Sequence, residues 1–91
     1  RSGLLTSLVE TARVERRLLA ATLMLRALLD AILARAYAKA YGHGARYLKA
    51  LRELAHEVDD YRGHVTHEMY EQRLRLTHGR KTSFWARLVD E

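Results

Sequence analysis

The chain has 91 residues, a net charge of +5 at pH 7 and a pI near 10.0. This length is typical of one small domain, here 1–91, which can bury about 60–65% of the surface that its unfolded chain exposes. The chain has no cysteine, so a disulfide framework and a thiolate metal site are both excluded. The basic charge permits a polyanionic partner but does not require one.

The apolar run at 18–34 has about the length of a marginal membrane span. Arg26 and Asp30 stand in its middle, so the run predicts a buried helix instead. The first residues also lack the order of a signal peptide. We therefore expect a cytoplasmic protein without a membrane partner. Because the chain opens without Met and enters a helical pattern at once, we expect a fragment of a longer protein.

Apolar residues recur at helical spacing from the start of the chain and predict a first helix over 4–13: Leu4, Leu5, Leu8, Val9 and Ala12. The stripe fails where Glu15 and Arg16 take the next apolar positions. This change of phase predicts a tight turn at 13–17 between two antiparallel helices. The alternative is a single helix over 4–41, because no Gly or Pro interrupts that span.

The segment 18–41 is rich in Leu and Ala, which are strong helix formers, and is apolar on nearly every side. A helix of this kind is normally buried by several neighbours. Gly42 suits the left-handed residue that follows a helix, so we expect the helix to end at 41. A third helix is expected over 44–58, followed by a turn at 59–63.

Thr66 predicts the N-cap of a helix over 67–78, which Gly79 ends. A last short helix begins near Thr82 or Ser83 and has one apolar side. It is too short to be stable alone, so it must dock on the rest of the chain. The sequence therefore predicts an all-α fold of four to five helices with short connections, either a bundle or a helical-repeat fragment.

Five segments carry a resemblance to a known family: 18–23, 26–30, 39–48, 67–70 and 78–85. The last, with the order His-Gly-Arg-Lys-Thr-Ser-Phe-Trp, is the most specific. Together they resemble the C-terminal helical region of a bacterial protein family of unknown function, whose relatives accompany SWIM-type zinc fingers. The resemblance implies a tetratricopeptide-like end domain, no activity and a helix break near 13–16. The zinc-finger site cannot carry over, because the chain has no Cys.

A basic stretch follows Glu71 and holds the candidate phosphate or nucleic-acid contacts: Arg73, Arg75, Arg80 and Lys81. Since one helix ends at Gly79 and another begins near Thr82, free backbone N–H groups are expected beside these cations. Trp85 or Tyr70 could offer a stacking surface. The alternative is that Arg80 and Lys81 form a solvated turn.

His64 and His67 stand three residues apart, with Glu68 and Glu71 close by. A closed zinc site needs about four ligands, and no second helix offers a matching pair. We therefore expect no metal and no cofactor, and assign His67 a packing or capping role.

Arg26 and Asp30 stand four residues apart, so they stack on one face of the central helix. Buried charges need partners. We expect a structural ion pair that fixes the register of the helix. The alternative is a polar floor for a groove that receives a peptide or a further helix.

Catalysis is not expected, because the serines lack a nucleophile-elbow context and no glycine-rich phosphate loop is present. We expect a non-catalytic interaction module that docks a helix or peptide, with Arg residues orienting an acidic partner. The partner is another protein or the remainder of a longer chain, and a homo-oligomer stays open. Nucleic-acid binding is the second hypothesis, and an accessory role to an enzyme elsewhere in the chain is the third.

Overall fold

The structure is a computed structural model that describes the backbone of residues 2–89 and the side chains of 3–89. Its elements are α1 (Ser2–Arg35), the short 3-10 turn η1 (Ala38–Ala40), α2 (Tyr41–Leu54), α3 (His67–His78) and α4 (Thr82–Val89). No strand occurs within the described part of the chain, so the all-α prediction is confirmed with four α-helices. The molecule is elongated, with extents of 55 × 24 × 21 Å.

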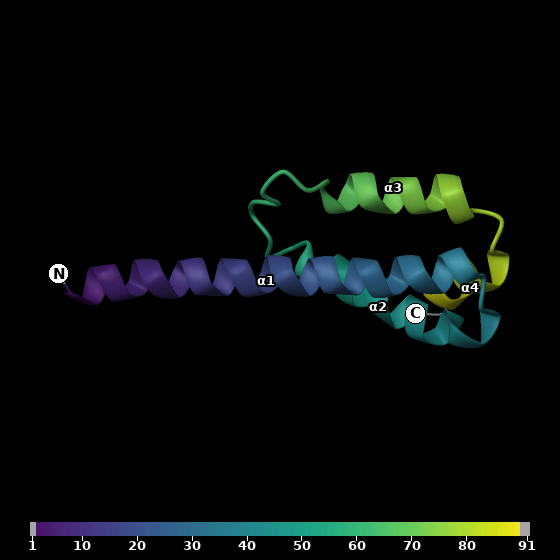
Figure 1. Ribbon diagram of the computed structural model, residues 1–91, viewed down its shortest axis with the longest axis horizontal. Coiled ribbons are helices and arrows are strands. Elements are labelled where there is room, and N and C mark those ends of the chain that lie inside the picture. The colour runs from purple at the N-terminus through teal and green to yellow at the C-terminus, as the bar shows by residue number, and fades with distance from the viewer. Residues whose placement is uncertain (1, 90–91) are drawn as a thin grey trace.

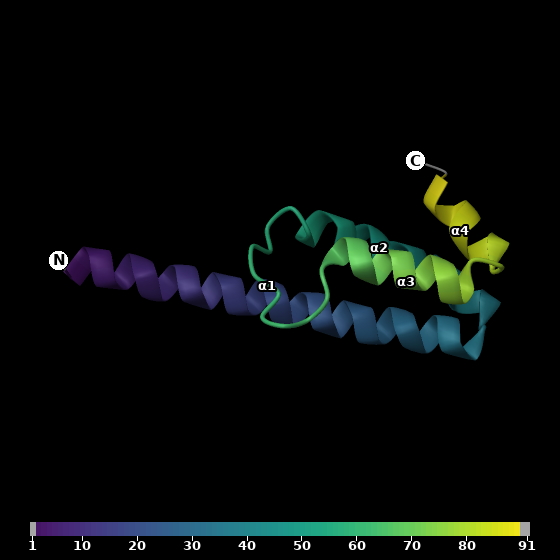
Figure 2. The ribbon, with the colours of Figure 1, turned by 90° about the horizontal axis from the view of Figure 1, so that it is seen from above.

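The helix α1 runs unbroken for 34 residues. The predicted turn at 13–17 is therefore wrong, and the alternative of one continuous helix holds as far as Arg35. The physical reason is that this stretch contains neither Gly nor Pro, so the change of apolar phase leaves the hydrogen-bond ladder intact. The N-terminal part of α1 extends well beyond the other elements, as Figures 1 and 2 show.

The C-terminus of α1 is closed by Ala36, which has a left-handed φ of 52°. The N–H of Tyr37 donates to the carbonyl of Ile32 (3.4 Å), and the N–H of Ala36 donates to that of Leu33 (3.1 Å). This pair of bonds is the Schellman pattern. The expected end at 41 is therefore wrong, and Gly42 lies in the first turn of α2 instead of capping α1.

The helix α2 packs against both α1 and α4. All four helices contribute to the buried core: Leu29, Leu33, Tyr41, Ala45, Leu48, Leu51, Tyr70, Leu74 and Phe84. Gly44 lies at the closest approach, because a Cβ there would come within 3.2 Å of the Phe84 ring and 3.3 Å of the Leu29 side chain. The short helix α4 docks through the fully buried Phe84, as its one-sided apolar pattern requires.

The bounds of α3 agree with the prediction of 67–78. Thr66 is its N-cap, since the Thr66 hydroxyl accepts from the N–H of Met69 at 3.3 Å. The backbone of α3 approaches the other helices closely at few points. Long side chains fix it instead, chiefly Tyr70 toward α1 and Glu71 toward α2.

Candidate interaction surfaces

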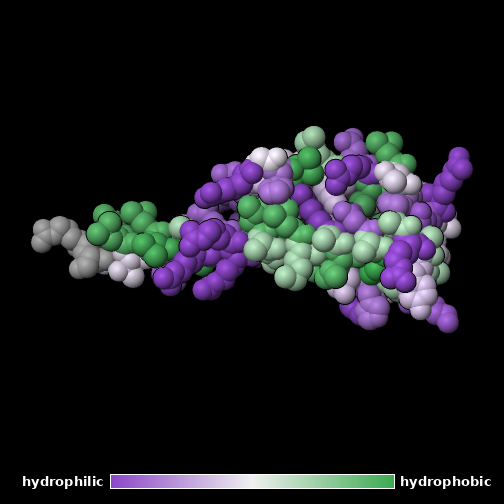
Figure 3. All heavy atoms as spheres, viewed as in Figure 1, coloured by the Kyte–Doolittle hydropathy of each residue, from purple (hydrophilic) through white to green (hydrophobic). Residues whose placement is uncertain are grey.

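An apolar stripe lies open to solvent on the projecting part of α1. Its members are Leu4, Leu5, Leu8 and Val9, which are 67%, 65%, 60% and 51% exposed. We call these four residues the α1 stripe. Their spacing places them along one side of the helix. Figure 3 shows green apolar surface at this end of the molecule, followed by a band of purple, hydrophilic surface.

A hollow of about 410 Å³ lies farther along α1, where the loop between α2 and α3 crosses it. Leu19 and Leu23 line it from α1, and Asp60 and Arg62 line it from the loop. Glu15 and Arg16 also line this space. Leu5, Ala12 and Leu19 recur at seven-residue intervals, so the hollow continues the same side of α1 as the stripe.

Arg73 and Arg75, two of the candidate cations, are used within the fold. The Arg73 guanidinium lies over the ring of Tyr70 at 5.6 Å, and that of Arg75 lies over the ring of Trp85 at 4.2 Å. Residues two apart on a helix point in nearly opposite directions. The structure therefore does not bring these two cations together on one surface.

Lys81 and Arg80 occupy the turn before α4. Lys81 is half-buried and its Nζ donates to Nδ1 of His78 at 2.9 Å, whereas Arg80 is exposed. Burial, and then the neighbouring ammonium of Lys81, lower the pKa of His78 below its usual value.

The backbone of this turn departs from the sequence expectation. The N–H groups of Lys81, Thr82 and Phe84 donate to the carbonyls of His78, Arg80 and Lys81 at 3.0, 2.9 and 3.0 Å. Three of the amides in the turn where free N–H groups were expected are therefore already bonded.

A compact charge cluster centres on Glu71. Arg52 donates to its two carboxylate oxygens at 3.0 and 2.7 Å, and Nε2 of His67 lies 2.9 Å from Oε1. Arg75 lies 3.5 Å from Oε2. The hydrogen bonds from Arg52, helped by His67, lower the pKa of Glu71 to about 2 although burial opposes the shift. Sequence spacing gave no sign of the contact between Arg52 and Glu71, which are 19 residues apart and on different helices.

The two histidines considered as metal ligands have different environments. His67 is buried in the first turn of α3, while His64 is exposed in the preceding loop, and Glu68 is exposed as well. Over residues 3–89, no group of three or more His, Cys, Asp or Glu is arranged to hold a metal ion.

Arg26 and Asp30 do not pair directly with each other. Arg26 donates from Nη1 to the carbonyl of Val65 at 2.9 Å, and Asp30 accepts from the hydroxyl of Tyr70 at 2.8 Å. The same hydroxyl lies 3.3 Å from the carbonyl of Arg26. The predicted ion pair is thus replaced by a link through Tyr70, because both charged groups reach outward to α3 and its preceding loop. This link fixes α1 against α3, as the pair was expected to fix the register of α1.

None of the helices between residues 2 and 89 has the length and apolar character needed to cross a membrane. Residues 4–87 match the family described as "Family of unknown function (DUF6880)". No curated protein and no solved structure matches the chain significantly. The match extends from the α1 stripe into α4, and it agrees with the expected membership of a family without an assigned function. The chain therefore belongs to this family of unknown function, DUF6880.

Proposed function

We propose that the chain is a non-catalytic helical interaction module that binds an amphipathic helix of a protein partner along the α1 stripe. The observation that carries this proposal is the exposure of four large aliphatic side chains on one side of a projecting helix. Exposed apolar surface of this kind, bordered by charged residues, is typical of protein interaction sites. A helix laid against it would use apolar anchors at intervals of three and four residues.

The composition of the projecting segment supports a need for a partner. Among the residues from 3 to 11 are Gly3, Thr6, Ser7, Val9 and Thr11, all of them weaker helix formers than Ala or Leu. Isolated helices of about this length are marginal in water. The segment would therefore gain order as well as burial from a neighbouring helix.

An arginine in line with the stripe favours an acidic partner. Arg16 is exposed and stands seven residues after Val9, so it lies beyond the stripe on the same side of α1. A partner helix with Asp or Glu flanking its apolar face would meet this guanidinium group. The Leu19–Leu23 hollow would then receive the end of that helix.

The size of the stripe limits its affinity. Burying four aliphatic side chains that are more than half exposed contributes on the order of 5 kcal/mol before the cost of association. A nanomolar complex requires about 12 kcal/mol. The stripe alone therefore supports a weak contact, and a stronger complex needs a second one.

The proposal also covers the type of helical arrangement and the setting of the protein. We infer a tetratricopeptide-like arrangement, supported by the α1–α2 pair that packs into one core with α4. We also infer the bacterial origin that the family resemblance implies, and the cytoplasmic setting expected from the charged apolar run and the start of the sequence. Nucleic-acid binding stays a prediction, although the separated directions of Arg73 and Arg75 give it less support.

Photocrosslinking in the native host tests the module. Benzoylphenylalanine replaces Leu8 in the stripe or, as the matched control, Glu10 on the opposite side of the same helix. We expect one defined helical segment of a partner protein to crosslink at position 8 and not at position 10. Leu5→Glu should abolish that crosslink, and because Leu5 is 65% exposed the fold should survive.

Three results would overturn the proposal. These are equal labelling at both positions, no labelling at either position, and labelling confined to a second copy of the chain. The last result would identify the stripe as a homo-oligomer interface.

A further inference from the structure

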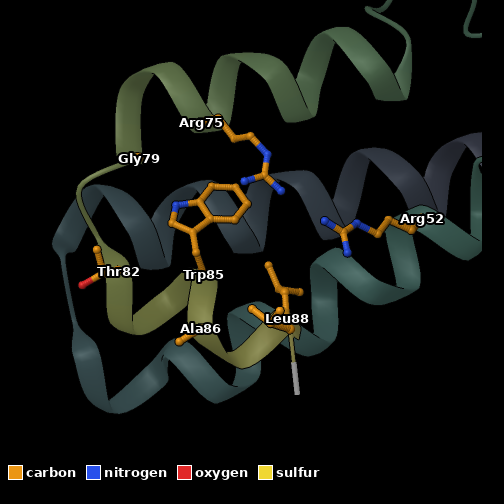
Figure 4. Close-up of a pocket in the computed structure, with 8 residues that line it drawn as sticks. Arg52, Arg75, Gly79, Thr82, Trp85, Ala86 and Leu88 are labelled. Carbon is orange, nitrogen blue, oxygen red and sulfur yellow. The ribbon is translucent and has the colours of Figure 1, made fainter. Parts of the chain in front are cut away.

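A groove of about 560 Å³ lies between α3, α4 and the C-terminal half of α2, remote from the α1 stripe. Its apolar side is formed by Trp85, Leu88 and Val89 of α4. Arg75 of α3 and Arg52 of α2 line the other side. Figure 4 shows the Arg75 guanidinium over the indole of Trp85, and Arg52 reaching toward the same space.

The indole at the centre of the groove is held in place. Its Nε1 donates to the carbonyl of His78 at 3.0 Å. Its ring packs edge-on with the ring of the buried Phe84, with 5.0 Å between the ring centroids. The bond to His78 ties α4 back to the end of α3. Because the indole is already fixed, a ligand that packs on it loses little binding free energy to the ordering of this side chain.

The charge of the groove is unbalanced. Among the residues of 3–89 that line it are two arginines and no carboxylate. The Glu71 side chain, which is only 18% exposed, lies behind them. Its carboxylate contacts Arg52, Arg75 and His67 at once. Arg75 is 56% exposed and its contact to Glu71 is 3.5 Å long, so it keeps N–H donors for a ligand.

We propose that this groove binds a short peptide segment in which an Asp or Glu stands beside an aliphatic residue. The carboxylate accepts hydrogen bonds from Arg75, and the aliphatic side chain packs on Leu88 and on Val89, which is 79% exposed. The groove volume falls within the range of known ligand sites, about 300–1,000 Å³. This site goes beyond the helix-binding function proposed for the stripe and does not depend on it.

The test uses Trp85 as reporter, since it is the only tryptophan in the chain. Fluorescence titrations compare the capped peptide Gly-Leu-Glu-Leu-Gly with Gly-Leu-Gln-Leu-Gly. We expect the Glu peptide to bind about tenfold more tightly, and its affinity to fall as salt rises. Arg75→Gln should remove this preference.

Arg73→Gln is the matched control, because it makes the same change on the opposite side of the same helix and should keep the preference. Ala86→Glu offers a second variant, in which an exposed groove residue gains a carboxylate that competes for Arg75. We expect this variant to lose peptide binding while its circular dichroism stays unchanged.

Equal affinities for the two peptides, or an Arg75→Gln affinity equal to that of the unmodified chain, would overturn the proposal. A single-stranded oligonucleotide is titrated in parallel. If it displaces the peptide and loses affinity equally in Arg73→Gln and Arg75→Gln, the basic stretch binds nucleic acid and the peptide site is rejected.

Discussion

At the scale of the residue, the fold depends on an arginine held mainly by ring faces. Arg26 is 6% exposed, and its guanidinium lies 5.3 Å from the ring of Tyr61 and 4.7 Å from that of Tyr70. Its Nε and Nη2 are buried without a hydrogen-bond partner, and burial lowers its pKa from the usual value. Cation–π contacts strengthen when both groups are desolvated, which compensates part of this cost.

Glu71 leads to a prediction about acid stability. Its pKa is about 2 in the folded chain against an ordinary value of 4.5, chiefly because Arg52 bonds the ionised form. The stabilisation is therefore complete above pH 4.5 and is lost as the pH falls toward 2. We expect Glu71→Gln to lower the free energy of unfolding by about 2 kcal/mol at pH 7.

Urea denaturation at pH 7, 4 and 2.5 measures this effect. The difference between Glu71→Gln and the unmodified chain should shrink steadily as the pH falls. Glu57→Gln, at an exposed position, should change the stability by less than about 0.5 kcal/mol at every pH. A difference for Glu71→Gln that stays constant with pH would disprove the role assigned to its charge.

The residues of these polar centres were only partly predictable. The sequence singled out Arg26 and Asp30 because a spacing of four places them on one helix face. It could not show that the hydroxyl of Tyr70, 40 residues from Asp30, would donate a hydrogen bond to the Asp30 carboxylate. The partner of Glu71 was hidden for the same reason, because tertiary contacts between polar side chains leave no periodic trace in a sequence.

At the scale of the element, local signals explain which boundaries were predictable. The bounds of α3 followed from a cap at Thr66 and a stop at Gly79. The end of α1 did not follow, because Ala36 adopts a left-handed backbone that its side chain disfavours by about 1–2 kcal/mol. Packing of α2 against α1 imposes this turn, and the glycine that suggested a cap stands six residues later.

This turn gives a prediction at the same scale. Ala36→Gly should raise the free energy of unfolding by about 0.5–1 kcal/mol, since the relief of strain exceeds the added entropy of the unfolded chain. Ala34→Gly, inside the last turn of α1, should instead lower it by about 1 kcal/mol. Thermal and urea unfolding of the two variants would check the opposite signs. Destabilisation by Ala36→Gly would contradict the backbone strain assigned to Ala36.

At the scale of the whole molecule, the body and the projecting part of α1 should differ in stability. The core residues of α1, such as Leu29 and Leu33, are fully buried, whereas the stripe is exposed on a segment of weak helix formers. Local opening is easiest where few apolar contacts must be broken. We therefore expect the amide hydrogens of 4–13 to exchange much faster than those of 27–33.

Hydrogen exchange followed by mass spectrometry tests this expectation across a dilution series. Fast exchange at 4–13 that does not change with concentration fits a solvated monomer. Slow exchange at low concentration would mean that the segment is stable without a partner. Protection that appears only at high concentration would reveal self-association through the stripe.

The unbroken helix α1 has a consequence for avidity. It runs about 50 Å, at roughly 1.5 Å per residue, from the stripe into the body that carries the groove (Figure 1). A partner that carries a helix and an acidic segment on one chain gains from bivalent binding only if its own linker spans the distance between these sites. A shorter linker leaves two weak, independent contacts. Under the two binding proposals, the length of α1 therefore sets the separation that the two motifs of a bivalent partner must match.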